Sequence, residues 1–316
     1  MVKTILNFDH FNHLKLPFYE DLKKPFNVVE LFREAQPDQA IQENADSTVA
    51  ILCNTPHKIT RRMIEALPNL EIISTNSVGF DHIDLEAAKE RGIVVSHTPD
   101  LVTNDTADIA LSLMINVLRR IVEADAYVRV GNWERKGDIG LGHSLTGKKV
   151  GIVGLGRIGK AIARRAEAID CKVSYYGRSK KDDVDYEFVP DLKDLAKQSD
   201  ILVVVCASTP ETKNLINMDV LEALGPNGYL VNVSRGAVVH EEDLLIALAN
   251  KAIAGAGLDV YQNEPNVPDA LKTMDNVVLL PHIGTATKET RTEMAKLAIA
   301  NIVHWFDKGE TLTRVV

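Results

Sequence analysis

Short runs of apolar and β-branched residues alternate with amphipathic segments along almost the whole chain, which is typical of a parallel α/β architecture. In the first part of the chain the runs predict strands at residues 3–8, 47–53, 70–76 and 92–97. The segment DLEAAKERG predicts a helix that Asp84 caps and Gly92 ends. A longer helical pattern follows from about Asn104 to Val130.

A second and more regular series of strands begins at residue 148. Its predicted strands are residues 148–154, 172–177, 200–207, 228–234, 254–260 and 276–282. The segment 289–309 has apolar positions at helical spacing. No low-complexity linker separates the two series. We therefore predict two Rossmann-like lobes with parallel sheets, in which a dinucleotide-binding domain (101–285) is inserted into a discontinuous substrate-binding domain (1–100 and 286–316).

Composition narrows the class of protein. The chain of 316 residues is 45% hydrophobic and 25% charged, an ordinary balance for a globular protein of two domains. Its net charge of −8 argues against general nucleic-acid binding. The apolar run 109–118 is too short to span a membrane, and we predict a buried helix there. The N-terminus lacks a signal-peptide pattern.

The three cysteines, Cys53, Cys171 and Cys206, are far apart and show no metal-ligand spacing. An odd number of widely separated cysteines in apolar settings is typical of reduced thiols in a cytoplasmic protein. We therefore expect no metal site, no disulfide and a cytoplasmic location.

The stretch VGIVGLGRIGKAIARRAEAID contains a Gly-x-Gly-x-x-Gly motif between a predicted strand and a predicted helix. In a dinucleotide-binding loop the first glycine permits the tight turn, the second lets the backbone approach a pyrophosphate, and the third allows close helix packing. The alternative is an ordinary strand–turn–helix, but the motif has the required context on both sides. The expected cofactor contacts in this loop are Gly154, Leu155, Gly156, Arg157, Ile158 and Gly159.

Eighteen residues after Gly159 the sequence SYYGRSKK has no carboxylate where an NAD-binding fold normally places one to bind the ribose. Gly177 stands there, followed by Arg178, Ser179 and Lys180. A carboxylate would repel a 2′-phosphate, whereas a guanidinium can bind it bidentately. A basic solvated turn is the alternative. The pattern predicts that the protein prefers NADP(H) to NAD(H).

Three polar residues follow successive predicted strands: Arg235, Glu264 and His282. The carboxyl ends of parallel strands line one crevice, so these residues can converge on one site. Each alone has a plain explanation, as a turn arginine, a loop carboxylate or a core histidine. Together they suit ketone reduction, which needs a proton donor near neutral pH, a group that orients it and a cation for the substrate carboxylate.

The chain resembles the D-isomer-specific 2-hydroxyacid dehydrogenase family from about residue 45 to residue 305. The motifs that carry the resemblance are SVGFDHID (77–84), GLGRIG (154–159), NVSRGAVV (232–239), AGLDVYQNEP (256–265) and LLPHIGTAT (279–287). The N-terminal forty residues resemble the family only in pattern.

The resemblance implies an Arg235–Glu264–His282 triad and a substrate carboxylate held by the backbone amides of Val78 and Gly79, with Arg235 and His282 also contacting the substrate. It implies a homodimer. It also implies further cofactor contacts at Cys206, Pro210, Thr212, Val233, Arg235, Asp259, His282 and Gly284. Within the family, the Gly177–Arg178–Ser179 pattern is similar to NADPH-using glyoxylate/hydroxypyruvate and hydroxyphenylpyruvate reductases.

The combined expectation is an oxidoreductase that transfers hydride from NADPH to a small 2-oxoacid of the glyoxylate/hydroxypyruvate type. His282 is expected to donate the proton, Glu264 to orient and charge His282, and Arg235 to polarise the oxo group. Two alternatives stay open: a reductase of 2-ketogluconate or an aryl pyruvate, and a corepressor-like protein that senses the dinucleotide. Trp133 is expected either to project towards a site or to pack at a helix end.

Overall fold

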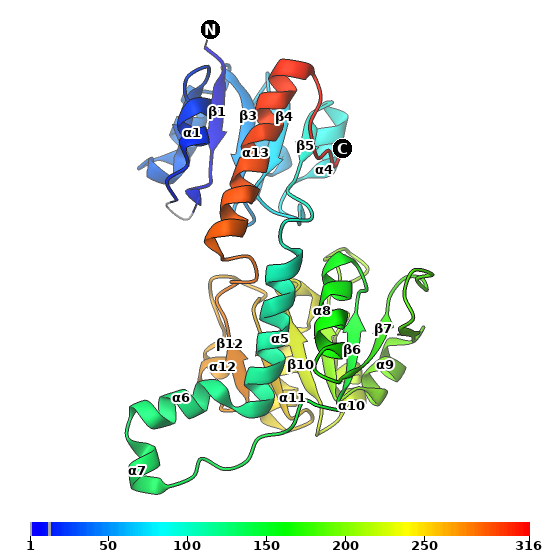
Figure 1. The fold of residues 1–316 in the computed structure, drawn as a ribbon. Coiled ribbons are helices and arrows are strands. Elements are labelled where there is room, and N and C mark those ends of the chain that lie inside the picture. Colours follow the sequence, from blue (N-terminus) through cyan, green and yellow to red (C-terminus); the bar gives the residue numbers. More distant parts are fainter. Residues whose placement is uncertain (1, 12–13) are drawn as a thin grey trace. The chain divides into compact units, whose positions relative to one another are not determined.

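The computed structural model describes residues 2–11 and 14–316 and divides into two compact units (Figure 1). Unit 1 comprises residues 1–102 and 286–316, and unit 2 comprises residues 103–285. The first boundary therefore lies two residues beyond the one expected at residue 100. The assignment of a substrate to unit 1 and of a nucleotide to unit 2 stays a prediction at this stage.

Unit 1 contains a five-stranded parallel sheet with the order β2-β1-β3-β4-β5. Its strands are β1 (Thr4–Asn7), β2 (Asn27–Glu30), β3 (Thr48–Cys53), β4 (Ile72–Thr75) and β5 (Val94–Ser96). Four of them are fully buried, as their apolar runs predict. Strand β2 was not predicted, because its sequence NVVE is short, half-exposed and lies at the edge of the sheet.

Helices cover both faces of the sheet of unit 1. They are α1 (Pro17–Leu22), α2 (Pro37–Glu43), α3 (Arg61–Glu65), α4 (Leu85–Glu90) and α13 (Lys288–Lys308), with a 3₁₀ turn at Leu31–Arg33. Helices α1 and α13 pack on the face that carries Ile5 and Ile72, and α2, α3 and α4 pack on the opposite face. This packing explains why the C-terminal helix belongs to unit 1. The predicted cap is confirmed, since the Asp84 carboxylate accepts a hydrogen bond from Ala87 N–H.

Unit 2 contains a seven-stranded parallel sheet with the order β12-β11-β10-β9-β6-β7-β8. Its strands are β6 (Lys149–Val153), β7 (Lys172–Tyr176), β8 (Glu187–Phe188), β9 (Ile201–Val204), β10 (Tyr229–Asn232), β11 (Gly255–Leu258) and β12 (Val277–Leu279). The strand order reverses between β6 and β9. In open α/β sheets ligands bind outside the carboxyl ends of the strands at such a point.

Most helices of unit 2 lie in two layers, one on each face of this sheet. The helices of the unit are α5 (Thr103–Arg119), α6 (Ile121–Arg129), α7 (Asn132–Lys136), α8 (Arg157–Glu167), α9 (Leu192–Gln198), α10 (Met218–Leu224), α11 (Glu241–Ala249) and α12 (Asp269–Thr273), with a 3₁₀ turn at Gly236–Val238. Helices α5 and α8 pack on one face, and α9, α10 and α11 on the other. Among the described residues, no helix is long and apolar enough to cross a membrane.

The expectation of a single helix from about Asn104 to Val130 is wrong. Arg120 has a left-handed backbone (φ 55°) that ends α5 and begins α6. Its side chain donates hydrogen bonds to Glu123 and to the Ile139 carbonyl, which stabilises the break. The expectation of a buried segment at 109–118 is confirmed, because α5 buries most of its apolar positions against the sheet.

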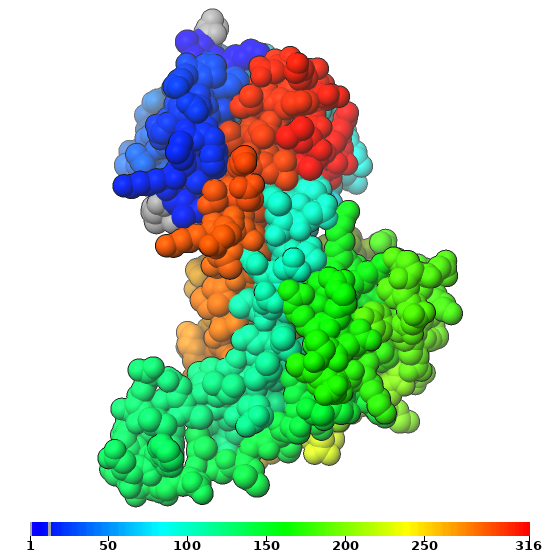
Figure 2. Space-filling model, in the orientation of Figure 1, coloured from blue at the N-terminus to red at the C-terminus, as the bar shows by residue number. Residues whose placement is uncertain are grey.

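Residues 120–142, called here the arm, extend away from the rest of unit 2 (Figures 1 and 2). Helix α6 has no buried residue. The arm instead exposes large apolar side chains, with Trp133 62% and Leu141 95% exposed, accompanied by Ile121, Val122, Val128 and Val130. Monomeric proteins rarely expose so many apolar side chains on one projecting element. Trp133 therefore does not pack at its helix end.

Candidate active site

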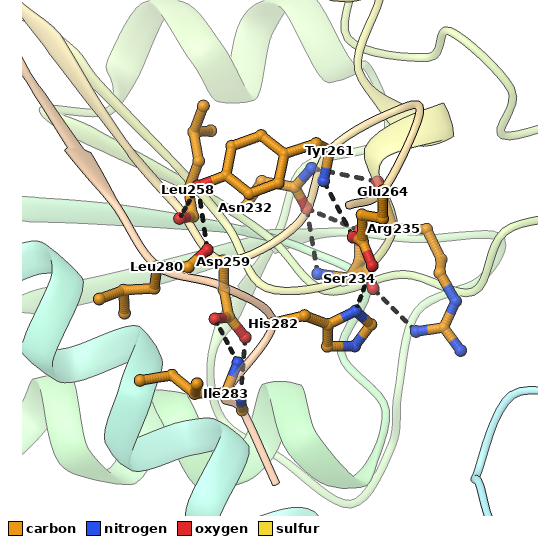
Figure 3. Close-up of polar contacts among 11 residues, drawn as sticks. Asn232, Ser234, Arg235, Leu258, Asp259, Tyr261, Glu264, Leu280, His282 and Ile283 are labelled. Carbon is orange, nitrogen blue, oxygen red and sulfur yellow. Dashed lines mark hydrogen bonds and ion pairs between the residues drawn. The ribbon is translucent and has the colours of Figure 1, made fainter. Parts of the chain in front are cut away.

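The polar residues expected to be catalytic follow three adjacent parallel strands of unit 2. Arg235 follows β10, Glu264 follows β11 and His282 follows β12, so their loops lie at the same edge of the sheet. The structure brings Glu264 and His282 into direct contact, with 2.7 Å between His282 Nδ1 and Glu264 Oε2 (Figure 3). This contact leaves His282 Nε2 as the ring nitrogen available to a ligand.

The carboxylate of Glu264 accepts a second hydrogen bond through its other oxygen, since Tyr261 N–H lies 3.0 Å from Oε1. Burial alone would raise the pKa of Glu264. The hydrogen bond and charge of His282, the Tyr261 N–H and the charge of Arg235 outweigh burial and hold that pKa below its ordinary value. Glu264 is therefore ionised at neutral pH and presents a negative charge to His282.

Asp259 holds the turn that carries His282. The backbone of His282 is left-handed (φ 54°), an uncommon conformation for a non-glycine residue. The main-chain oxygen of Asp259 accepts from His282 N–H (2.9 Å), and its carboxylate accepts from the N–H groups of Ile283 (2.7 Å) and Gly284 (2.8 Å) (Figure 3). Asp259 is buried, and burial raises its pKa more than these N–H groups lower it. Its expected contact with the cofactor stays a prediction.

Gly236 lets the Arg235 loop lie directly against the Glu264 loop. A Cβ atom on Gly236 would lie 1.9 Å from the carbonyl carbon of Tyr261, so only glycine fits. Asn232 shapes the same loop, because its amide accepts from Ser234 N–H and donates to the Arg235 carbonyl (Figure 3). The roles of Gly236, Tyr261 and Asn232 were not predicted, and the glycine that follows Arg235 was the only signal in the sequence.

The glycine loop after β6 has the close approaches that its motif predicts. Gly154 is left-handed (φ 102°), and a Cβ there would lie 2.7 Å from Cys206 Cα, while a Cβ on Gly159 would lie 2.3 Å from the Gly154 oxygen. Gly156 has no atom within 4 Å of its Cβ position, so the backbone at the start of α8 is open to a ligand. Helix N-termini bind phosphate groups through the N–H groups of their first turn. The loop therefore fits a dinucleotide pyrophosphate.

The segment after β7 is also accessible. Arg178, Ser179 and Lys180 are exposed, and Gly177 has open space around its Cβ position, with the nearest atom 4.0 Å away. The segment is anchored at its far end, where Lys181 N–H donates to the buried Tyr175 hydroxyl at 2.7 Å. Gly177 directly follows β7, where an NAD-binding fold normally places a carboxylate for the ribose, and the exposed residues after it suit a phosphate.

The loop after β9 contains the expected cofactor contacts Cys206, Pro210 and Thr212. Burial raises the pKa of Cys206 to about 11, so its thiol is neutral. The Thr212 hydroxyl donates to the Ala207 carbonyl and accepts from Thr209 N–H, which closes the loop on itself. Leu155 and Val233 are buried in the sheet core beside these loops. All three cysteines are free thiols.

In unit 1 the segment after β4 contains Val78 and Gly79. The Ser77 hydroxyl donates to the Gly79 carbonyl (2.6 Å), and His97 Nδ1 lies 2.9 Å from the Val78 carbonyl. Among the described residues, neither the Val78 N–H nor the Gly79 N–H has a hydrogen-bond acceptor. Two consecutive unpaired N–H groups can bind an anion. Within the described part of the chain, no cluster of three or more His, Cys, Asp or Glu side chains could hold a metal.

Residues 111–284 match the model of the D-isomer specific 2-hydroxyacid dehydrogenase NAD-binding domain. The chain belongs to this family. It is 46% identical over 94% of its length to hydroxyphenylpyruvate reductase of Plectranthus scutellarioides (95% of that protein). It is also 46% identical over 82% of its length to 2-ketogluconate reductase of Gluconobacter oxydans (83% of that protein).

Among solved structures, the chain is similar to NADPH-dependent glyoxylate/hydroxypyruvate reductase from Sinorhizobium meliloti in complex with NADP and malonate. The identity is 38%, the TM-score is 0.89, and the match covers 100% of this chain and 97% of the other. The family and the two-sheet α/β fold expected from the motifs are therefore confirmed. By family the chain is a D-2-hydroxyacid dehydrogenase, and the three similar proteins named above are all reductases.

Proposed function

We propose that the protein reduces a small 2-oxoacid of the glyoxylate/hydroxypyruvate type to the 2-hydroxyacid, with NADPH as the preferred donor. The observation that carries the proposal is the 2.7 Å contact between His282 and an ionised Glu264 at the edge of a dinucleotide-binding sheet. This is the arrangement that a general acid requires when it works near neutral pH.

NADPH, when bound, supplies the hydride that adds to carbon 2 of the substrate. His282 supplies the proton: Nδ1 is held by Glu264, and the proton on Nε2 passes to the carbonyl oxygen as negative charge develops there. Arg235, whose charge also acts on Glu264, stabilises that oxygen and pairs with the substrate carboxylate. The imidazole is then neutral and must regain a proton from water before the next turnover.

The substrate carboxylate is assigned to the N–H groups of Val78 and Gly79. Two observations support this assignment. Both N–H groups lack an acceptor among the described residues, and the carbonyl oxygens of Val78 and Gly79 already take part in hydrogen bonds. A carboxylate next to the reacting carbonyl is thus a requirement of the site. Aldehydes and ketones without it are expected to be poor substrates.

The preference for NADPH rests on residues 177–180. Open space at Gly177 and the exposed Arg178, Ser179 and Lys180 favour a 2′-phosphate, and Gly177 replaces the carboxylate that an NAD-binding fold normally places after this strand. The loop Gly154–Gly159 holds the pyrophosphate. Cys206, Pro210 and Thr212 border the adenosine side, Asp259 lies near the nicotinamide, and Val233 and Gly284 are further cofactor contacts.

The arm supports a homodimer. Its exposed apolar side chains, Trp133 among them, need a partner surface, and a second copy of the chain supplies one by symmetry. The same proposal includes Trp133, which projects from the arm of one subunit towards the active site of the other. Three free thiols without a disulfide support a cytoplasmic location.

The test is a kcat/KM panel with glyoxylate, hydroxypyruvate, hydroxyphenylpyruvate and 2-ketogluconate, each with NADPH and with NADH. The proposal predicts that one of the first two substrates with NADPH is the best pair. A best rate with 2-ketogluconate or hydroxyphenylpyruvate would move the protein to another substrate class of the family. Tight NADPH binding without turnover of any 2-oxoacid would favour a dinucleotide-sensing role instead.

A further inference from the structure

Two loops of unit 1 run side by side at the carboxyl end of its sheet. Cys53, the last residue of β3, pairs with Thr75 of β4, and Asn76 N–H donates to the Cys53 carbonyl at 2.8 Å. Further on, Ile59 N–H donates to the His82 carbonyl at 2.9 Å. The segment 54–59 therefore lies along the segment 76–82, which carries the proposed carboxylate-binding N–H groups.

The His57 side chain of segment 54–59 is held by a ring contact and a hydrogen bond. Its ring packs against Phe8, with 5.5 Å between the ring centroids, and its Nδ1 lies 2.7 Å from Asn54 Oδ1. Burial lowers the pKa of His57 by more than the nearby Asp9 raises it. The ring is therefore neutral at pH 7 and carries one proton, which Nδ1 donates to Asn54.

This arrangement makes Nε2 of His57 a fixed hydrogen-bond acceptor, since the nitrogen without the proton presents a lone pair. No described residue donates a hydrogen bond to it. The two carboxylate oxygens of Asp9 are already engaged, because one accepts from Phe11 N–H (2.7 Å) and the other from the Asn76 amide (2.7 Å). Asn76 Oδ1 has no hydrogen-bond partner among the described residues, but it is buried. His57 is less buried than Asp9 and Asn76, so of these three side chains it is the one that offers an acceptor to a hydroxyl group of a ligand.

We propose that His57, oriented by Asn54, is a specificity-determining residue whose Nε2 accepts a hydrogen bond from a hydroxyl group on carbon 3 of the 2-oxoacid. The inference rests on the proposed function, and it selects among that function's substrates. Hydroxypyruvate, which carries this hydroxyl, is favoured over pyruvate, which has a methyl group in its place. Pyruvate is disfavoured because its methyl group leaves His57 Nε2 without a hydrogen-bond donor after binding.

The test compares kcat/KM for hydroxypyruvate and pyruvate with saturating NADPH in the wild type, in His57→Phe and in His57→Gln. Phenylalanine keeps a ring against Phe8 but has no acceptor, and is expected to lower the hydroxypyruvate-to-pyruvate ratio about tenfold, the cost of one lost hydrogen bond. Glutamine places an amide oxygen near the Nε2 position and is expected to restore part of the ratio. Lys58→Ala, an exposed neighbour in the same loop, is the matched control and is expected to leave the ratio as in the wild type.

An unchanged ratio in His57→Phe would overturn the inference while leaving the reductase function intact. An equal loss for both substrates, with no recovery in His57→Gln, would show that His57 only supports the fold and would also overturn it. A wild-type protein that reduces no 2-oxoacid with either cofactor would refute the proposed function itself, and the inference with it.

Discussion

Replacing Glu264 by glutamine should separate the charge of this residue from its shape. The carboxylate accepts two hydrogen bonds, one from His282 and one from Tyr261 N–H. Glutamine has only one acceptor oxygen, so its NH₂ group must face one of these two partners. If the oxygen keeps Tyr261, the amide donates to Nδ1 of His282 and opposes the protonated ring.

The size of the effect follows from the geometry. A charge-assisted hydrogen bond of 2.7 Å to a side chain that is two-thirds buried is worth about 1.5–3 kcal/mol, and partial exposure favours the lower part of that range. Loss of this stabilisation in the transition state lowers kcat/KM for reduction about tenfold to a hundredfold.

The sign of the pH dependence follows from the lowered pKa of Glu264. A carboxylate whose pKa is lowered on folding stabilises its charged partner at any pH above the ordinary carboxyl pKa. This stabilisation is lost only as the pH falls through the lowered pKa of the folded protein. In the wild type the charge is thus present throughout the neutral range. In Glu264→Gln the protonated His282 loses this support, so reduction should fall off at lower pH than in the wild type.

The assay is a pair of pH profiles of kcat/KM for reduction, after solvent isotope effects show that chemistry limits the rate. Glu241→Gln is the matched control, because the Glu241 carboxylate accepts from Gln262 N–H in the neighbouring loop rather than from His282. An alkaline limb at the same pH in Glu264→Gln and in the wild type would refute the role given to Glu264.

Three further predictions test other parts of the site. Gly236→Ala should lower kcat/KM about a hundredfold, because the new Cβ must displace the Tyr261 backbone and separate the two catalytic loops; full activity in a folded Gly236→Ala protein would contradict this role. Gly177→Asp combined with Arg178→Ala should shift the NADPH-to-NADH ratio of kcat/KM towards NADH about tenfold to a hundredfold, and equal use of both cofactors by the wild type would refute the assignment. Trp133→Asp should weaken the dimer in sedimentation experiments about tenfold or more, whereas a wild-type monomer at micromolar concentration would rule out the dimer.

Much of the fold could be predicted because parallel strands buried on both faces are continuous apolar runs. The expected strand at 148–154, for example, contains β6 (Lys149–Val153), and the expected strand at 47–53 contains β3 (Thr48–Cys53). Strand β8 (Glu187–Phe188) was missed because two residues at a sheet edge leave no periodic signal. The break at Arg120 was missed because a left-handed arginine, unlike a glycine or proline, has no sequence signature.

The residues of the candidate site could be predicted where the proposed reaction requires a particular type of side chain. Glu264 and His282 follow strands that end at one edge of a sheet, and the structure places them in contact. The supporting residues were not predictable, because their roles depend on backbone contacts between loops. Gly236 is required only because the Tyr261 carbonyl lies beside it, and the hydrogen bonds of Asp259 to the turn after His282 depend on the register of two strands.

The most direct test of the central claim is the fate of the transferred hydrogen. Wild-type protein is incubated with glyoxylate or hydroxypyruvate and NADPH that carries deuterium at the transferable position of carbon 4, and the product is analysed by mass spectrometry. The expected product is a 2-hydroxyacid with one deuterium on carbon 2, and His282→Ala is expected to give almost no product. A product without deuterium, or the same rate of labelled product from His282→Ala, would contradict it.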